Sequence, residues 1–136
     1  MADRIAFELV SPERLLLSVE ADMVVVPGAE GDFAVLVGHQ PMISLLRPGS
    51  IDVYDGDKIA ERVFVAGGFV EVTGEKLVVL AEEATAFRDV DRAALAERIA
   101  AARKALEEMP DHEHKRTAAE EFLIYLEHMY EVSHVN

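Results

Sequence analysis

Hydrophobic residues between Arg4 and Ala86 come in short runs, which are separated by turn residues such as Pro48-Gly49 and Asp55-Gly56-Asp57. Runs filled with Val, Ile, Leu and Phe and bounded by Gly, Pro and Asp are typical of strands that lay one face on a core. Their regular spacing predicts an antiparallel β-sandwich or barrel. The expected strands cover residues 5–10, 15–19, 21–26, 33–37, 42–46, 50–54, 58–64, 69–72 and 77–80.

The hydrophobic period changes after Phe87. Large apolar residues then recur three or four positions apart, which predicts two amphipathic helices. We expect the first over residues 91–109, capped by Asp89 or Asp91. Pro110 interrupts the pattern, and the second helix begins either just after it or at Thr117 and runs to about Met129. The two stripes consist of Leu95, Ile99, Ala102, Leu106 and Met109, and of Ala119, Phe122, Leu126 and Met129.

The change of period also marks the domain organisation. Two helices joined by a short link fold back as an antiparallel hairpin. The period changes near residues 86–89, and this is the plausible domain boundary. The sequence therefore predicts a β-sandwich domain over residues 1–86, followed by a helical hairpin over residues 87–136.

Residues 24–41 combine two short strands with a glycine-rich corner, and they read Val-Val-Val-Pro-Gly-Ala-Glu-Gly-Asp-Phe-Ala-Val-Leu-Val-Gly-His-Gln-Pro. The tip of the corner carries two acids, Glu30 and Asp32, and His39 follows at the next turn. Loops that are held by a sheet are the usual place for binding residues. We interpret this corner as the working edge of a non-catalytic protein.

Composition excludes several classes of partner. The chain has 136 residues, a formal net charge of −13 and no cysteine. Such a charge is repelled by nucleic acid and by anionic lipid, so neither nucleic-acid binding nor direct membrane insertion is expected. Without cysteine there is no disulfide and no thiolate metal site. The chain lacks a signal peptide pattern and an apolar run of roughly 18 residues, and we expect it to be soluble or held at a membrane by a partner.

No group of residues predicts catalysis or metal binding. His39, Asp32 and Ser44 do not form a hydrolase pattern, because no Gly-x-Ser-x-Gly elbow is present. The sequence His112-Glu113-His114 places its two histidines on opposite sides of a helix, so we expect solvated residues and not a metal site. Gly67-Gly68 lacks the Lys-Ser/Thr of a phosphate loop and is better explained by a bend in a strand.

Taken together, four segments resemble the epsilon subunit of F-type ATP synthases, whose mitochondrial counterpart is called delta, and one of the four is Val-Val-Leu-Ala at residues 78–81 with the alanine-rich helical region that follows it. The most specific part is Val-Pro-Gly-x-Glu-Gly-Asp-Phe at residues 26–33, followed by Gly-His-Gln-Pro at 38–41 and Leu-x-Pro-Gly at 46–49. Residues 7–14 and 64–72 are similar to the family's opening strand and central strand pair. The resemblance covers essentially the whole length.

The resemblance implies a ten-stranded antiparallel β-sandwich at the N-terminus and a helix-loop-helix hairpin at the C-terminus. It implies a non-catalytic subunit of the central rotor stalk, which couples the gamma subunit to the c-ring for rotary ATP synthesis. The residues that correspond to the ring-facing corner are Glu30, Gly31, Asp32 and His39, near Pro41. The setting implied is the cytoplasmic face of a bacterial inner membrane, where the subunit is peripheral.

In bacterial relatives the hairpin can extend toward the alpha/beta catalytic hexamer and inhibit ATP hydrolysis, and some relatives bind ATP at the start of the first helix. This chain departs from that ATP pattern and keeps a weak remnant in Asp89, Asp91 and Arg92, so we expect no cofactor. No Lys or Arg follows Arg116. An acidic second helix would be repelled by acidic catalytic subunits, and we therefore expect weak inhibition.

Two other interpretations fit the residues without the resemblance. The chain could be a free-standing β-sandwich adaptor that dimerises through its hairpin, in which case it would not purify with a coiled-coil partner. It could also be a small enzyme with a site at the glycine-rich corner, although the sequence offers no convergent set of acids and bases there.

Overall fold

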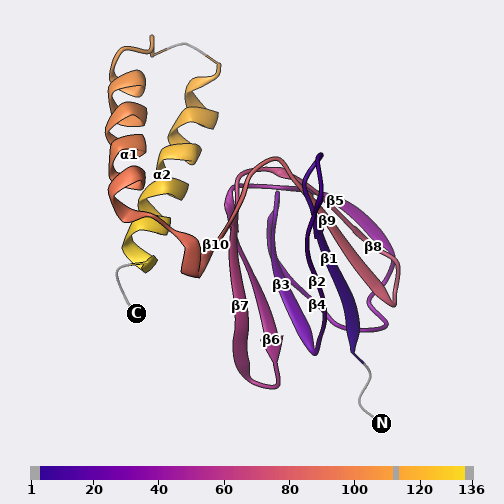
Figure 1. Cartoon of the computed structure of the whole chain (residues 1–136). Coiled ribbons are helices and arrows are strands. Elements are labelled where there is room, and N and C mark those ends of the chain that lie inside the picture. The colour runs from indigo at the N-terminus through magenta and orange to yellow at the C-terminus, as the bar shows by residue number, and fades with distance from the viewer. Residues whose placement is uncertain (1–3, 112–113, 134–136) are drawn as a thin grey trace. The chain divides into compact units, whose positions relative to one another are not determined.

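The computed structural model describes residues 4–111 and 114–133. The chain divides into two compact units, residues 1–86 and residues 87–136 (Figure 1). The first unit is built from strands and the second from helices. Within the described residues, neither helix is long and apolar enough to cross a membrane.

Ten strands form the first unit, as the resemblance implied. Along the sheet the order is β10-β7-β6-β3-β5-β8-β9-β1-β2, and β4 pairs with β3 off this path. The pairings are antiparallel except for β1 with β9, which is parallel. The strands are β1 (Ile5–Val10), β2 (Leu15–Ala21), β3 (Met23–Gly28), β4 (Gly31–Val35), β5 (Met42–Leu46), β6 (Gly49–Asp55), β7 (Lys58–Val65), β8 (Gly68–Val72), β9 (Lys76–Ala81) and β10 (Ala84–Ala86).

The nine strands expected from the sequence are all present, with ends that differ by up to two residues. The sequence did not reveal β10. Its three residues, Ala-Thr-Ala, form no hydrophobic run, and they become a strand because they pair with Val63–Val65 of β7. Tertiary pairing therefore decides this strand, not local propensity.

The core of the sandwich follows from the two-residue period. In β1 the side chains of Ile5, Phe7 and Leu9 are buried, while the residues between them are partly exposed. The partner strand β9 likewise buries Leu77 and Val79. Burying a side chain of this size contributes about 1.5–3 kcal/mol. Alternation of this kind fixes the register, because a slip by one residue would turn the buried set outward.

Gly68 marks the point where β8 begins and the chain passes very close to β9. Its φ angle is +126°, and a Cβ atom there would lie 1.9 Å from the carbonyl oxygen of Leu80. No other residue can be accommodated so close to a backbone oxygen. The Gly67-Gly68 pair is therefore explained by strand packing.

The second unit contains a 3-10 turn, Phe87–Asp89, and two helices, α1 (Arg92–Glu107) and α2 (Arg116–Ser133), which pack against each other. Asp91 caps α1, since its carboxylate accepts from the backbone N–H groups of Ala93 and Ala94, both at 3.1 Å. The prediction of Asp91 as a cap is confirmed. The expected start of α2 at Thr117 or just after Pro110 is replaced by a start at Arg116.

Three arginines join the two helices. Arg116 donates to the carbonyl oxygens of Leu106 and Met109 at 3.1 and 3.0 Å, so it ties the start of α2 to the backbone at the end of α1. Further along, Arg103 of α1 pairs with Glu127 of α2, and the guanidinium of Arg92 lies 3.9 Å from the centre of the Tyr130 ring. The hairpin is thus held together by contacts within itself.

Candidate interaction site on the β-sandwich

The glycine-rich corner is the hairpin between β3 and β4. Gly28 pairs with Gly31, and Ala29 and Glu30 form the two-residue turn. A Cβ atom on Gly28 would lie 2.7 Å from the ring of Phe33. The absence of a side chain at Gly28 therefore lets the Phe33 ring pack against the turn. This packing supports the acidic residues at the tip of the hairpin.

Arg47 fastens this corner to the turn between β5 and β6. Its Nη1 atom donates to the carbonyl oxygen of Gly28 at 2.5 Å, and its Nη2 atom pairs with the carboxylate of Asp32. The charge of Asp32 is therefore compensated within the chain. Glu30 is exposed, and its carboxylate has no hydrogen bond or ion pair to the residues that the structure describes.

A groove of about 620 Å³ runs along the corner. On one side of it the rings of Phe33 and His39 lie 6.2 Å apart, and His39 Nδ1 is 2.8 Å from the carbonyl oxygen of Gln40. The groove brings together four of the five candidates from the sequence, Glu30, Gly31, Asp32 and His39, whereas Pro41 is exposed and does not line it. Its lining residues are Gly28, Ala29, Glu30, Gly31, Asp32, Phe33, His39, Met42, Ile43, Ser44 and Leu45.

Three exposed hydrophobic side chains lie on β5 and the adjacent β8. Ile43 is 71% exposed, Leu45 is 67% exposed and Phe69, directly opposite Leu45, is 42% exposed. We call these three residues the apolar patch. Sequence reasoning missed them, because a run such as Met-Ile-Ser-Leu-Leu is equally consistent with a strand that is covered on both faces. The missed signal is that both residues on the outer face of this strand, Ile43 and Leu45, are hydrophobic.

The residues that could suggest a catalytic triad share this groove without the geometry of one. Ser44 donates its hydroxyl hydrogen to the carbonyl oxygen of Leu45 at 3.0 Å, and Asp32 is paired with Arg47. His39 is engaged with its neighbour's carbonyl. A nucleophile needs a base within hydrogen-bond reach, and these contacts do not provide one. His112 and Glu113, considered above as metal ligands, lie outside the described residues.

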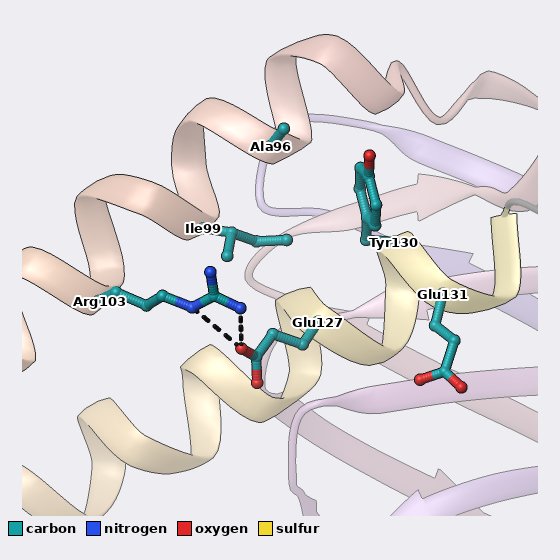
Figure 2. A pocket seen from close by; sticks show the side chains of 6 residues that line it. All are labelled: Ala96, Ile99, Arg103, Glu127, Tyr130 and Glu131. Carbon is teal, nitrogen blue, oxygen red and sulfur yellow. Dashed lines mark hydrogen bonds and ion pairs between the residues drawn. The ribbon is translucent and has the colours of Figure 1, made fainter.

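A second groove, of about 530 Å³, lies between α1 and α2 (Figure 2). Arg103 reaches across it, and its Nη2 and Nε atoms lie 2.7 and 3.2 Å from Glu127 Oε2. Figure 2 shows Glu131 pointing away from this pair. The groove is lined by Ala96, Ile99, Arg103, Glu127, Tyr130 and Glu131.

The residues of the ATP-pattern remnant make contacts within the hairpin. Asp91 is engaged as the cap of α1, and Asp89 lies in the preceding 3-10 turn. Arg92 stacks on Tyr130 and donates to the Tyr130 carbonyl oxygen at 3.3 Å. In the nearby groove Arg103 is paired with Glu127.

The architecture and the site define a class of protein: a β-sandwich joined to a helical hairpin. The sandwich carries an acid-tipped corner and an apolar patch, which are features of a binding subunit. Residues 4–87 match the family model described as "ATP synthase, Delta/Epsilon chain, beta-sandwich domain". The chain belongs to this family. It is a non-catalytic subunit of the rotor stalk.

Individual relatives support the same assignment over most of the chain. The ATP synthase epsilon chain of Paramagnetospirillum magneticum is 49% identical over 124 residues, which is 91% of this chain and 93% of the relative. That of Parvibaculum lavamentivorans is 44% identical over 134 residues, 98% of each chain. Among solved structures, a chain of the Euglena gracilis mitochondrial ATP synthase OSCP/F1/c-ring assembly matches with a TM-score of 0.74 at 26% identity, covering 92% of this chain and 80% of that one. The resemblance and the fold class predicted from the sequence are confirmed.

Proposed function

We propose that this chain couples the gamma subunit to the c-ring through the groove beside the β3–β4 hairpin. The observation that carries the proposal is the union of an apolar patch and an uncompensated acid at one site. Ile43 and Leu45 expose most of their side chains to water, and Glu30 projects from the adjoining turn. Interfaces commonly combine an apolar centre with a charged rim.

Within this site the roles divide by their contacts. The apolar patch supplies surface that gains free energy when gamma covers it, at about 25 cal/mol per Å² of apolar area. Glu30 is the acid that remains for a polar or basic loop of the c-ring. Asp32 and Arg47 hold the corner in place, and His39 supports Phe33 from the other side. These contacts make the corner rigid, and a rigid corner can transmit torque between the two partners.

The hairpin has a different role in this proposal. It stays closed on its own arginine contacts, binds no nucleotide and inhibits ATP hydrolysis weakly. The supporting observation is that α2 carries Glu120, Glu121, Glu127 and Glu131, and among its described residues it has no cation beyond Arg116. A helix of this charge docks poorly on an acidic catalytic subunit. The chain works at the cytoplasmic face of a bacterial inner membrane, held there by its partners.

The test is charge reversal in the assembled enzyme. Glu30→Lys in a reconstituted complex of the chain, gamma and the ring should lower ATP-driven proton pumping, and the loss should shrink at high salt because screening weakens the pairing. Glu13→Lys, in the exposed turn between β1 and β2, is the matched control and should pump normally. Unchanged pumping by the Glu30 variant at low salt would remove the ring contact from this corner.

A further inference from the structure

Strand β5 is covered along only part of one edge. On that edge it pairs with β3 through Gly28 and Leu46 alone. Two hydrogen bonds mark the place, from Ala29 N to Leu45 O at 2.8 Å and from Arg47 N to Pro27 O at 3.0 Å. The remainder of β3 pairs with β6 and β4 instead. Beyond Leu45, toward Met42, the edge of β5 therefore faces the groove.

The backbone groups that face the groove follow from strand geometry. In an antiparallel strand the N–H and C=O of one residue point to the same edge, and successive residues alternate between edges. Because the carbonyl of Leu45 points toward β3, the N–H groups of Leu45 and Ile43 and the carbonyl of Ile43 point the same way. Met42 and Ser44 face the opposite edge, where β8 pairs with β5.

The strand pairings of the described residues give these three groups no partner, because β3 pairs with β5 at Leu46 only and β8 lies along the opposite edge. Natural proteins usually protect an open edge with a charge, a proline or a bulge, because such an edge otherwise recruits another chain. Residues 42–46 contain no charge and no proline, and their pairing with β8 is regular. Two exposed hydrophobic side chains, Ile43 and Leu45, flank the open edge.

We propose that an extended segment of the gamma subunit adds a strand to the free edge of β5 inside this groove. The inference rests on the proposed function and specifies how the partner is recognised. The segment places apolar side chains on the apolar patch and leaves Glu30, on the adjoining turn, for the c-ring. Recognition by strand addition draws affinity from main-chain hydrogen bonds and specificity from alternate side chains.

Residue-resolved hydrogen exchange tests the backbone part of the proposal in the complex with gamma. The amides of Ile43 and Leu45 should slow by at least about tenfold when the complex forms, as hydrogen-bonded amides do. The amides of Met42 and Ser44 are already bonded to β8 and should change much less. Equal slowing of all four amides, or slowing of none, would overturn strand addition.

A pair of substitutions separates strand addition from side-chain docking. Ile43→Ala shortens the side chain and keeps the N–H, while Ile43→Pro also removes the N–H, which native pairing does not use. We expect Ile43→Pro to bind gamma about tenfold more weakly than Ile43→Ala, the scale of one interfacial hydrogen bond. Circular dichroism and thermal unfolding of both variants establish that the sandwich remains folded.

Each outcome has a distinct meaning. If both variants bind gamma equally weakly, the apolar patch is the contact and strand addition is wrong. If both bind as tightly as the unmodified chain, the proposed function of this surface fails as well. If Ile43→Pro instead abolishes self-association of the isolated chain and leaves gamma binding intact, the edge pairs with a second copy of the chain and not with gamma.

Discussion

The two grooves of this protein have similar volumes, about 620 and 530 Å³, but they differ in which of their side chains contact other residues of the chain. In the hairpin, Arg103 pairs with Glu127 and Arg92 lies on the Tyr130 ring, so the two arginines at and beside the groove are engaged within the hairpin. In the sandwich, Arg47 compensates Asp32 but leaves Glu30 without a partner in the described residues, next to exposed hydrophobic side chains. The hairpin groove is bridged by an ion pair of its own chain, whereas the sandwich groove presents exposed hydrophobic side chains, which we propose a partner covers.

The largest expected effect comes from placing charge in the apolar patch. The double variant Ile43→Asp with Leu45→Asp should weaken gamma binding by more than about 100-fold, because two unpaired carboxylates would be buried at the interface. The control is Ile59→Asp, at a residue that is also exposed but lies on β7. Co-purification and titration calorimetry measure the difference, and similar losses in both variants would contradict the special role of the patch.

The next effect should fall on the hairpin and leave the sandwich groove alone. Tyr130→Ala removes the ring under Arg92 and should destabilise the hairpin by about 1–2 kcal/mol, from lost apolar burial and cation–π contact. Tyr130→Phe keeps the ring and should stay within a few tenths of a kcal/mol of the unmodified chain. Hydrogen exchange of α1 and α2 reports the change. A large loss of gamma affinity in Tyr130→Ala would contradict the proposal that gamma binds the sandwich groove and not the hairpin.

A smaller effect is expected at Arg47, which joins the β3–β4 hairpin to the turn between β5 and β6. Arg47→Gln should lower the free energy of unfolding by about 0.5–1 kcal/mol, because the pair with Asp32 is exposed and screened while the bond to the Gly28 carbonyl is partly buried. Equilibrium denaturation measures this, with Arg14→Gln in an exposed turn as the control. The double variant with Asp32→Asn should be less destabilised than the sum of the two single variants, since both remove the same interaction. Strict additivity would show that the two side chains act independently.

The smallest effect should come from the ion pair in the hairpin groove. Both partners are substantially exposed, and Glu127→Gln should cost at most about 0.5 kcal/mol. Glu131→Gln, in the same groove but pointing away from Arg103, is the control (Figure 2). Thermal unfolding at low and high salt checks the prediction. A salt-independent loss of several kcal/mol would mean that the groove depends on this charge far more than its exposure allows.

Much of the fold could be predicted because its signals are local. The alternation in β1 identifies a strand, and the spacing of Leu95 and Ile99 identifies a helix, without knowledge of any partner. The parallel pairing of β1 with β9 could not be read in the same way, because it joins residues such as Phe7 and Leu77 that are far apart in the sequence. Strand order depends on which hydrophobic faces meet, and many strands here have similar faces.

The candidate site was predictable only in part, for a related reason. Glu30 and Asp32 were recognised from the corner that carries them, but the sequence assigned them the same role. The difference arises from Arg47, which reaches Asp32 only after β5 has been laid beside the end of β3. The exposure of Ile43 and Leu45 was hidden as well, because an apolar strand looks the same whether its outer face is covered by its own chain or by a partner.

Maleimide labelling of single cysteines tests the contrast between the two grooves most directly, since the chain has no cysteine of its own. Leu45→Cys reports on the sandwich groove and Glu131→Cys on the hairpin groove. On assembly with gamma and the ring, labelling at position 45 should slow by at least about tenfold, because thiol reactivity requires access, while labelling at position 131 should not change. Unchanged labelling at position 45 together with protection at position 131 would show that the partners bind the hairpin groove and not the sandwich groove.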